Sequence, residues 1–248
     1  MKTILKVKDV IKNYNKNQRP SLNKVSFQVE NGEFIGIMGA SGSGKTTLLN
    51  VLSTIDKPTS GEIIINNINI KNLNSNKASD FRKNNLGFIF QEYFLLDSLT
   101  IEENISVPLT QLKKTPKEIE SSVKKLAKRF GIEEQLSKYP YELSGGQKQR
   151  AAASRAIIKN PNILFADEPT GALDSTSAKE LLLKLSEVNK DLNTTILMVT
   201  HDAYAASFSN RILIFKDGEI IKELKKENLS RKDFFEKILK EISEIENE

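Results

Sequence analysis

The sequence predicts an α/β fold with a parallel core of buried strands. Short apolar runs recur along the chain, each bounded by glycine or polar residues, and such runs are typical of strands buried on both faces. They lie at residues 34–38, 85–90, 162–167 and 194–199. Helical patterns follow several of these runs, which is the alternation expected of a parallel α/β core.

A smaller antiparallel sheet is expected beside this core. Residues 3–11 alternate loosely and predict an edge strand, and residues 25–29 alternate as a second strand. Residues 63–70 predict short strands broken at Asn66 and Asn67, and residues 211–221 predict a closing hairpin.

The period changes to that of helices from about residue 92 to residue 160. This change predicts a helical subdomain inserted into the core. We therefore expect one domain over residues 1–225, followed by an amphipathic helical tail over residues 226–248.

Composition sets the class of protein. The chain has 248 residues, 38% of them hydrophobic, no cysteine and a net charge of +5. The absence of cysteine excludes disulfides and fits a reducing compartment. No apolar run approaches the ~18 residues of a spanning helix and no signal-peptide pattern begins the chain, so we expect a cytoplasmic protein. The positive charge is spread around the chain without a basic cluster, which favours a solvated surface over a nucleic-acid partner.

The motif with the clearest chemistry follows the first buried run. It matches the phosphate-loop pattern G-x-x-x-x-G-K-[ST] between a predicted strand and a predicted helix. Its residues are Gly39, Ala40, Ser41, Gly42, Ser43, Gly44, Lys45, Thr46 and Thr47. Glycines let several backbone N–H groups point at one anion, and the helix adds the positive end of its dipole. With Lys45 reaching the β- and γ-phosphates and Thr46 ligating Mg²⁺, the loop predicts a nucleoside triphosphate site.

Polar residues end the other buried runs, where open α/β sheets place their ligands. Gln91, Asp167 with Glu168, and His201 each stand at such a position. Asp167 is placed to hold Mg²⁺ directly or through water, and Glu168 to accept a proton from an attacking water. His201, the single histidine of the chain, is placed to donate a hydrogen bond to a γ-phosphate oxygen.

A second helix start with anion-binding character is predicted just before a helix over residues 148–158. It consists of Leu143, Ser144, Gly145, Gly146 and Gln147. Serine and glycine at a helix N-terminus suit an anion, and they equally suit an ordinary helix cap. These residues alone leave both interpretations open.

Other segments carry weaker signals. Tyr14, in the polar stretch 13–18, suits stacking on a nucleobase or a half-buried loop position. Thr115 and Glu118 predict a capping box for a helix that Gly131 ends. Ser177 with Glu180 predicts the cap of the next helix.

The tail carries an apolar stripe. Its residues are Phe234, Ile238 and Ile242, with Phe235, Leu239 and Ile245 beside them. Docking on the chain's own core and docking on a partner are both open.

Together these stretches resemble the ATP-binding subunit of an ABC transporter over nearly the whole chain. The Leu143–Gln147 segment in one chain with the phosphate loop and Asp167-Glu168 is highly specific for that family. The other matches, in family order, are Tyr14 with the adenine-stacking loop, Gln91 with the glutamine loop, Asp174 with the aspartate loop and His201 with the switch histidine.

The resemblance implies a P-loop NTPase of the ABC ATPase type: a RecA-like core, an antiparallel β subdomain and an inserted α-helical subdomain. It implies ATP and Mg²⁺ as cofactors, and as partners a transmembrane permease and a second copy of the chain in an ATP sandwich. The protein would then sit on the inner face of the membrane through the permease. Residues 94–96 would receive a coupling helix of that permease.

The resemblance also implies roles for individual residues. Catalytic roles fall to Glu168, His201, Lys45 and Gln91, and Mg²⁺ is served by Thr46, Gln91 and Asp167. Tyr14 would stack on adenine and residues 39–47 would cradle the phosphates. Ser144, Gly145, Gly146 and Gln147 would contact the ATP bound to the opposite copy.

Finer features resemble the lipoprotein-releasing and macrolide-exporter group, and within it the bacitracin-resistance (Bce-type) ATPases. The segments that carry this resemblance are residues 37–44, 49–52, 87–91, 165–175 and 198–202, with the tail's Phe234-Phe235. Ser154, where the wider family usually has alanine, departs from the pattern outside the site. The implied function is an ATP-hydrolysing subunit for antimicrobial-peptide resistance or export, with an indirect link to a sensor kinase as a further implied partner.

Alternative functions share the same chemistry. An ATPase of a lipoprotein-release or cell-division complex would drive a membrane partner without transporting a solute. A chromosome-maintenance or DNA-repair ATPase would carry a coiled coil or zinc modules between residues 47 and 143, and this chain has neither heptads nor cysteines there.

Overall fold

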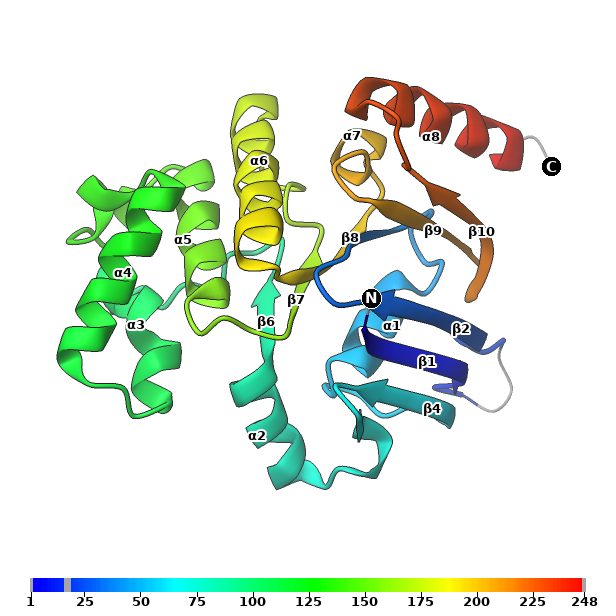
Figure 1. Cartoon of the computed structure of the whole chain (residues 1–248), viewed down its shortest axis with the longest axis horizontal. Helices are drawn as coiled ribbons and strands as arrows, with labels where there is room; N and C mark the ends of the chain where they lie inside the picture. Colours follow the sequence, from blue (N-terminus) through cyan, green and yellow to red (C-terminus); the bar gives the residue numbers. More distant parts are fainter. Residues whose placement is uncertain (1, 16–18, 247–248) are drawn as a thin grey trace.

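The structure is a computed structural model that describes residues 2–15 and 19–246. Residues 16–18 of the polar stretch after Tyr14, and residues 247–248 of the tail, lie outside the described part. Figure 1 shows helices α3, α4 and α5 at the left and the antiparallel sheet at the lower right, with strands β6, β7 and β8 of the main sheet between them and β9 and β10 above the antiparallel sheet. Within the described residues no helix is long and apolar enough to cross a membrane.

The main sheet has six strands in the order β10-β9-β3-β8-β7-β6. They span β3 Phe34–Met38, β6 Leu86–Ile89, β7 Ile163–Asp167, β8 Thr195–Thr200, β9 Arg211–Lys216 and β10 Glu219–Lys225. Strand β3 pairs in parallel with β8 and with β9, and only β10 runs antiparallel to its neighbour. All residues of β3 and β8 are buried, so the continuous apolar runs correctly predict strands covered on both faces.

The register of this sheet aligns the strand ends. Met38 pairs with Thr200 and Asp167 pairs with Val199. The loops that follow β3, β7 and β8 therefore leave the same edge of the sheet. That edge is where the sequence places the phosphate loop, Glu168 and His201.

The second sheet is antiparallel, in the order β2-β1-β4-β5. Its strands are β1 Thr3–Lys12, β2 Leu22–Glu30, β4 Ser60–Ile65 and β5 Ile68–Asn69. The prediction of an edge strand at residues 3–11 is wrong. Val7 pairs with Phe27 on one side and with Ile63 on the other, so β1 is an inner strand. Its loose alternation comes from register shifts in both pairings, which irregular strands tolerate.

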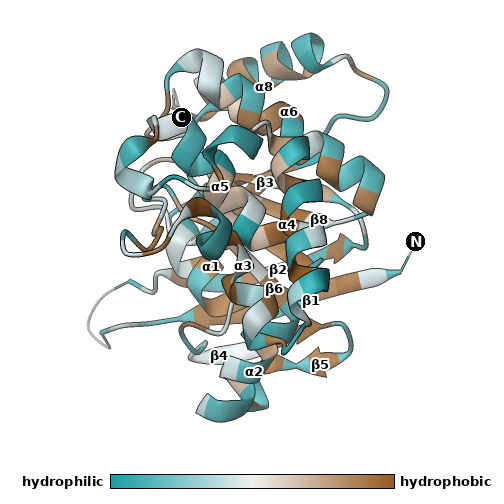
Figure 2. Cartoon of the chain, turned by 90° about the vertical axis from the view of Figure 1, so that its left-hand side faces the viewer, coloured by the Kyte–Doolittle hydropathy of each residue, from teal (hydrophilic) through white to brown (hydrophobic). Residues whose placement is uncertain are grey.

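Helices α3 Ile101–Gln111, α4 Pro116–Phe130 and α5 Gly145–Ile157 occupy the segment that the sequence predicts as helical. Helix α4 begins at the predicted capping box, in which Thr115 and Glu118 bond each other's backbone, and ends at Gly131 with φ 63°. Figure 2 shows apolar residues concentrated on the inner strands and on the inward faces of the helices.

The other helices include α1 Lys45–Leu52, α2 Ser75–Asn85, α6 Ser175–Leu192 and α7 Ala203–Ala206. The cap predicted for α6 is wrong. Asp174, not Ser177, caps this helix, because its carboxylate accepts hydrogen bonds from the N–H groups of Thr176 and Ser177.

The tail forms α8, Arg231–Glu246, and packs on the chain itself. Phe234 and Ile238 are completely buried in a cluster that also holds Met38 and Ala203. Leu239 is 46% exposed and faces away. Of the two open interpretations of the stripe, the structure supports docking on the chain's own core.

Candidate nucleotide-binding site

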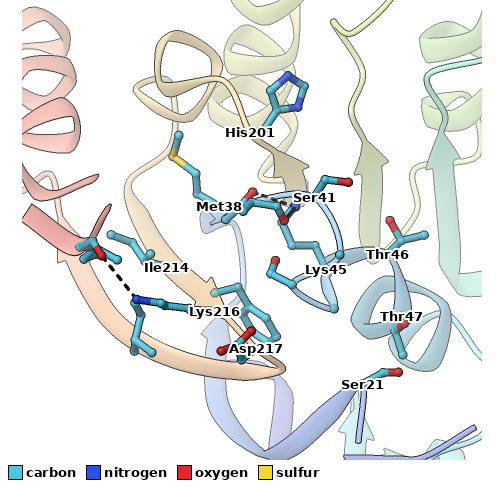
Figure 3. Close-up of a pocket in the computed structure, with 18 of the residues that line it drawn as sticks. Ser21, Met38, Ser41, Lys45, Thr46, Thr47, His201, Ile214, Lys216 and Asp217 are labelled. Atoms are coloured by element: carbon cyan, nitrogen blue, oxygen red, sulfur yellow. Dashed lines mark hydrogen bonds between the residues drawn. The ribbon is translucent and has the colours of Figure 1, made fainter. Parts of the chain in front are cut away.

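A cavity of about 1080 Å³ lies at the edge of the main sheet, over the phosphate loop. Figure 3 shows Ser41, Lys45, Thr46 and Thr47 on the loop side of this cavity, with His201 opposite. The complete loop from Gly39 to Thr47 lines the cavity, and Gln91, Glu168 and His201 line it as well. The structure thus brings together groups that are remote in sequence and that the sequence analysis assigned to one site.

Glycine is required at two positions of the loop by close backbone contacts. A Cβ atom at Gly39 would lie 2.2 Å from the carbonyl oxygen of Phe215. Gly44 has φ +105°, and a Cβ there would lie 2.3 Å from the carbonyl oxygen of Ser21. The loop is also tied to the β9–β10 turn, because the N–H of Gly218 donates to the carbonyl oxygen of Ser43 at 2.8 Å. These contacts fix the loop before any ligand arrives.

Lys45 is buried inside the loop. Its ammonium group donates to the carbonyl oxygens of Gly39 and Ala40 at 2.8 and 2.7 Å. Burial lowers the pKa of Lys45, against the opposing effect of the Glu168 and Asp167 carboxylates. In this arrangement the lysine ammonium group holds two carbonyl groups of the loop itself.

The two carboxylates at the end of β7 differ in environment. Burial and the nearby Glu168 raise the pKa of Asp167, whose Oδ1 is buried and has no hydrogen-bond partner. Glu168 has φ 45°, a backbone conformation that non-glycine residues rarely adopt, and its Oε2 lies 2.9 Å from Nδ1 of His201. An unpartnered buried oxygen and a strained backbone both point to a functional role at this turn.

Gln91 lies against the turn that follows the carboxylates. A Cβ atom at Gly171 would lie 3.0 Å from the side-chain amide nitrogen of Gln91. The close approach keeps this amide at the rim of the cavity, between the loop after β6 and the loop after β7.

Tyr14 does not line the cavity in the structure. It is 61% exposed, its ring has the Lys12 ammonium 4.6 Å from its centroid, and it reaches Asp56 and the hydroxyl of Thr47. Burial and the Asp56 carboxylate raise the pKa of Tyr14. The exposed ring therefore stands next to the last residue of the phosphate loop, with one face available for stacking.

The Ser144–Gln147 helix start lies elsewhere. Ser144 caps α5 by accepting a hydrogen bond from the N–H of Gln147, and the Gln147 side chain returns a contact to the N–H of Ser144. None of these residues lines the cavity. The cap interpretation of this segment is confirmed, and the segment does not meet the phosphate loop within one chain.

Two polar residues on α5 were not predicted from the sequence: Gln149, which is buried, and Arg155, which is half-buried. Gln149 is completely buried, and its amide donates to the carbonyl oxygens of Phe90 at 2.9 Å and Pro169 at 2.7 Å. Arg155 donates to the carbonyl oxygens of Tyr93 and Phe94. These bonds tie α5 to the loops that carry Gln91 and Glu168. The available signal was the pair of polar residues on the inner face of an alanine-rich helix.

The phosphate loop, the carboxylates after β7 and the strand order define the class of protein, which is a nucleoside triphosphatase built on a P-loop core. Comparison with known proteins gives the family. The ABC transporter family model matches residues 22–171. The bacitracin export ATP-binding protein BceA of Halalkalibacterium halodurans is 52% identical over 96% of this chain and 94% of its own.

Further relatives agree. The ABC transporter ATP-binding protein YxdL of Bacillus subtilis is 47% identical over 98% of this chain and 95% of its own. The dimeric ATP-binding cassette MJ0796, solved in a post-hydrolysis state bound to ADP and Pi, superposes with a TM-score of 0.82. It is 38% identical and covers 90% of this chain and 98% of its own. The chain belongs to the ABC transporter family, as its ATP-binding and ATP-hydrolysing subunit.

Proposed function

We propose that the chain powers a membrane transporter for antimicrobial peptides, in resistance to or export of bacitracin-like compounds. The similarity to the bacitracin export protein over nearly its whole length supports this substrate class. The observation that carries the mechanism is the Glu168–His201 contact of 2.9 Å at the mouth of the phosphate-loop cavity.

The binding roles follow from position. The N–H groups of residues 39–47 and the ammonium group of Lys45 bind the phosphates. These residues line the cavity, and their N–H groups carry partial and the ammonium group full positive charge. Tyr14 takes the adenine ring, since its exposed face adjoins Thr47 at the end of the loop.

Mg²⁺ fits the residues that are present. The unpartnered Oδ1 of Asp167, the hydroxyl of Thr46 and the amide oxygen of Gln91 are hard oxygen donors, the type that Mg²⁺ prefers. The described residues form no group of three or more acidic or histidine side chains that could hold a metal alone. The remaining ligands would therefore be phosphate and water oxygens, and the ion would supply neutralising charge to the phosphates.

Glu168 and His201 divide the chemistry. The Glu168 carboxylate takes a proton from the water that attacks the γ-phosphorus, and the bond to ADP breaks. His201 holds this carboxylate through Nδ1 and offers a hydrogen bond to a γ-phosphate oxygen. A neutral imidazole carries one N–H, so only the protonated form makes both contacts as donor.

A second copy of the chain completes the site. The Ser144–Gln147 segment has anion-binding character and lies away from the cavity of its own chain. In a head-to-tail pair it would close over the ATP held by the other copy. The dimeric state of the MJ0796 cassette supports this arrangement.

The permease would dock on the surface beside Gln91. Phe94 and Leu96 are 58% and 50% exposed, and Phe94 has φ 45°. Phe94 lines a pocket of about 320 Å³ together with Glu92, Tyr93 and Pro140, between the Gln91 loop and the helices over residues 92–160. An apolar coupling helix bound there would hold the chain on the inner face of the membrane. It would also contact the loop of Gln91, so that a movement of this loop would reach the permease.

Replacing the proposed base tests the mechanism. Glu168→Gln should keep ATP affinity and lose about 10²–10⁴-fold in turnover, the usual contribution of a positioned general base. ATP binding and phosphate release are measured on the same preparation. Turnover within about threefold of the native protein would remove Glu168 from this role.

A pull-down tests the partner. Tagged Glu168→Gln protein is incubated with ATP and membranes of its own cell, and the co-purifying proteins are identified. A permease with a large extracellular domain supports peptide-antibiotic transport, and a sensor kinase that follows it adds the signalling link. A small membrane protein without such a domain would instead indicate lipoprotein release or cell division.

A further inference from the structure

His201 makes few side-chain contacts of its own. Its side chain is 69% exposed, and within the described part of the chain it contacts the Glu168 carboxylate. An exposed imidazole on a loop is held in place mainly by its backbone, so the elements that hold residues 200–203 decide where the ring lies. Those elements include a part of the chain outside the nucleotide-binding motifs.

The backbone around His201 is fixed by its two neighbours. The N–H of Asp202 donates to the hydroxyl of Thr200, and the Asp202 carboxylate accepts from the N–H groups of Tyr204 and Ala205. Asp202 is thereby the N-cap of α7, a helix of a single turn that spans Ala203–Ala206. So short a helix has little stability of its own and depends on what packs against it.

Helix α8 provides that packing. The Tyr204 ring meets Phe235 of α8 edge to face, with centroids 6.3 Å apart, and meets Phe208 in the same way at 5.5 Å. The guanidinium of Arg231, at the start of α8, lies 4.9 Å from the Tyr204 ring and 4.8 Å from the Phe208 ring. An arginine over aromatic rings adds a cation–π attraction to the apolar contact.

The same helix borders the nucleotide cavity at its other end. Ile242 and Ile245 of α8 line the cavity, and the ammonium group of Lys216, which also lines it, donates to the carbonyl oxygen of Ile245. Figure 3 shows Lys216, Ile214 and Met38 on this side of the cavity. Met38 immediately precedes the phosphate loop and shares a buried cluster with Phe234 and Ile238. Helix α8 therefore contacts the segments that flank both the loop and His201.

We propose that α8 positions His201 for hydrolysis, with Arg231 and Phe235 as positioning residues that act through Tyr204 and α7. The inference rests on the proposed contact between His201 and the γ-phosphate. When Arg231 and Phe235 hold the Tyr204 ring, α7 keeps its turn and the imidazole stays within reach of Glu168. When they release it, His201 moves away while the phosphate loop remains formed.

Phe235→Ala tests the contact in the full-length protein. Phe235 is half-buried at the edge of its cluster, and the completely buried Phe234 and Ile238 still anchor α8. Leu239→Ala is the matched control, because it removes an exposed apolar side chain from the same helix. Phe235→Trp keeps an aromatic ring at the position and should restore the native behaviour.

Because the chain has a single histidine, the imidazole gives one Hε1 NMR signal, which reports directly on His201. Phe235→Ala and Arg231→Gln should shift this signal and lower kcat about tenfold, with KM for ATP nearly unchanged, since a small misplacement of a catalytic group slows only the chemical step. Leu239→Ala should change neither the signal nor kcat. A native signal and native kcat in both Phe235→Ala and Arg231→Gln would overturn the inference.

His201→Ala separates this inference from the proposed function. If His201→Ala leaves turnover intact, the proposed role of His201 fails, whatever α8 does. If His201→Ala abolishes turnover while Phe235→Ala and Arg231→Gln behave as the native protein, the role of His201 stands and the positioning by α8 fails. Circular dichroism melting of each variant verifies that the domain stays folded.

Discussion

Gly39 and Gly42 stand in the same loop and have different surroundings. A Cβ at Gly39 would strike the backbone of Phe215, which cannot move without shifting β9. Gly42 has φ +79°, and a Cβ there would meet nothing within 4 Å. The loop thus contains one glycine that sterics require and one that only conformation favours.

This contrast predicts the outcome of two alanine substitutions. Gly39→Ala should abolish nucleotide binding, because the loop cannot close around the new methyl group. Gly42→Ala should retain binding at reduced affinity, since the left-handed conformation costs a residue with a side chain about 1–2 kcal/mol. Titration with a fluorescent ATP analogue measures both variants. Equal affinities would show that the contact with Phe215 does not shape the loop.

For single residues, the sequence predicts most of those that line the cavity. The spacing and types of residues 39–47 indicate a phosphate loop, and the polar residues at the ends of the other buried strands are expected at the same edge of the sheet. Glu168, His201 and Gln91 line the cavity as predicted. Gln149 could not be found in this way. Its importance comes from two carbonyl groups, of Phe90 and Pro169, that lie far from it in the chain.

At the scale of single elements, the capping box of α4 makes the stability of the fold depend on pH. The backbone N–H and hydroxyl of Thr115, with the Lys114 ammonium, lower the pKa of Glu118 from 4.5 to about 2. A carboxyl group whose pKa is lower in the folded protein stabilises the fold above its unfolded pKa. That contribution is lost as the pH falls from about 4.5 towards 2.

Glu118→Gln should therefore lower the melting temperature at pH 7 and have a much smaller effect near pH 2, where the native side chain is already partly protonated. The melting temperature is followed by circular dichroism across this range. Glu134→Gln, at an exposed acid in the turn after α4, is the control. A loss of stability that is the same at both pH values would mean that the capping box is not the source.

Element boundaries were predictable where a local signal is complete, as at Thr115 and Gly131. The cap of α6 shows the limit. Asp174 and Ser177 both lie at the start of an amphipathic helix, and both can serve as N-cap residues. Sequence spacing alone does not decide which side chain accepts hydrogen bonds from the first N–H groups of the helix. Strand β1 shows a second limit, because edge and inner positions depend on pairing with β4, a strand that lies about fifty residues further along the chain.

For the whole molecule, the central consequence of the proposed function is that each chain would hold only part of a catalytic site. The cavity contains the phosphate loop and the proposed base, and the Ser144–Gln147 segment is absent from its lining. In the proposed pair, the positively polarised helix start of the second copy would close the open side of the ATP. The residues of the segment alone left its role open, and the resemblance to the family predicted the separation. The structure adds the placement of α5 that keeps the segment out of the cavity lining.

The most direct test is the molar mass of the Glu168→Gln protein in solution, measured by light scattering with and without Mg²⁺ and ATP. We predict a monomer without nucleotide and a dimer with it, because binding without hydrolysis traps the closed pair. Adding Ser144→Arg, which places a bulky side chain at the helix start, should prevent the dimer while each chain still binds ATP. A protein that binds ATP and remains a monomer at all concentrations would contradict the shared site.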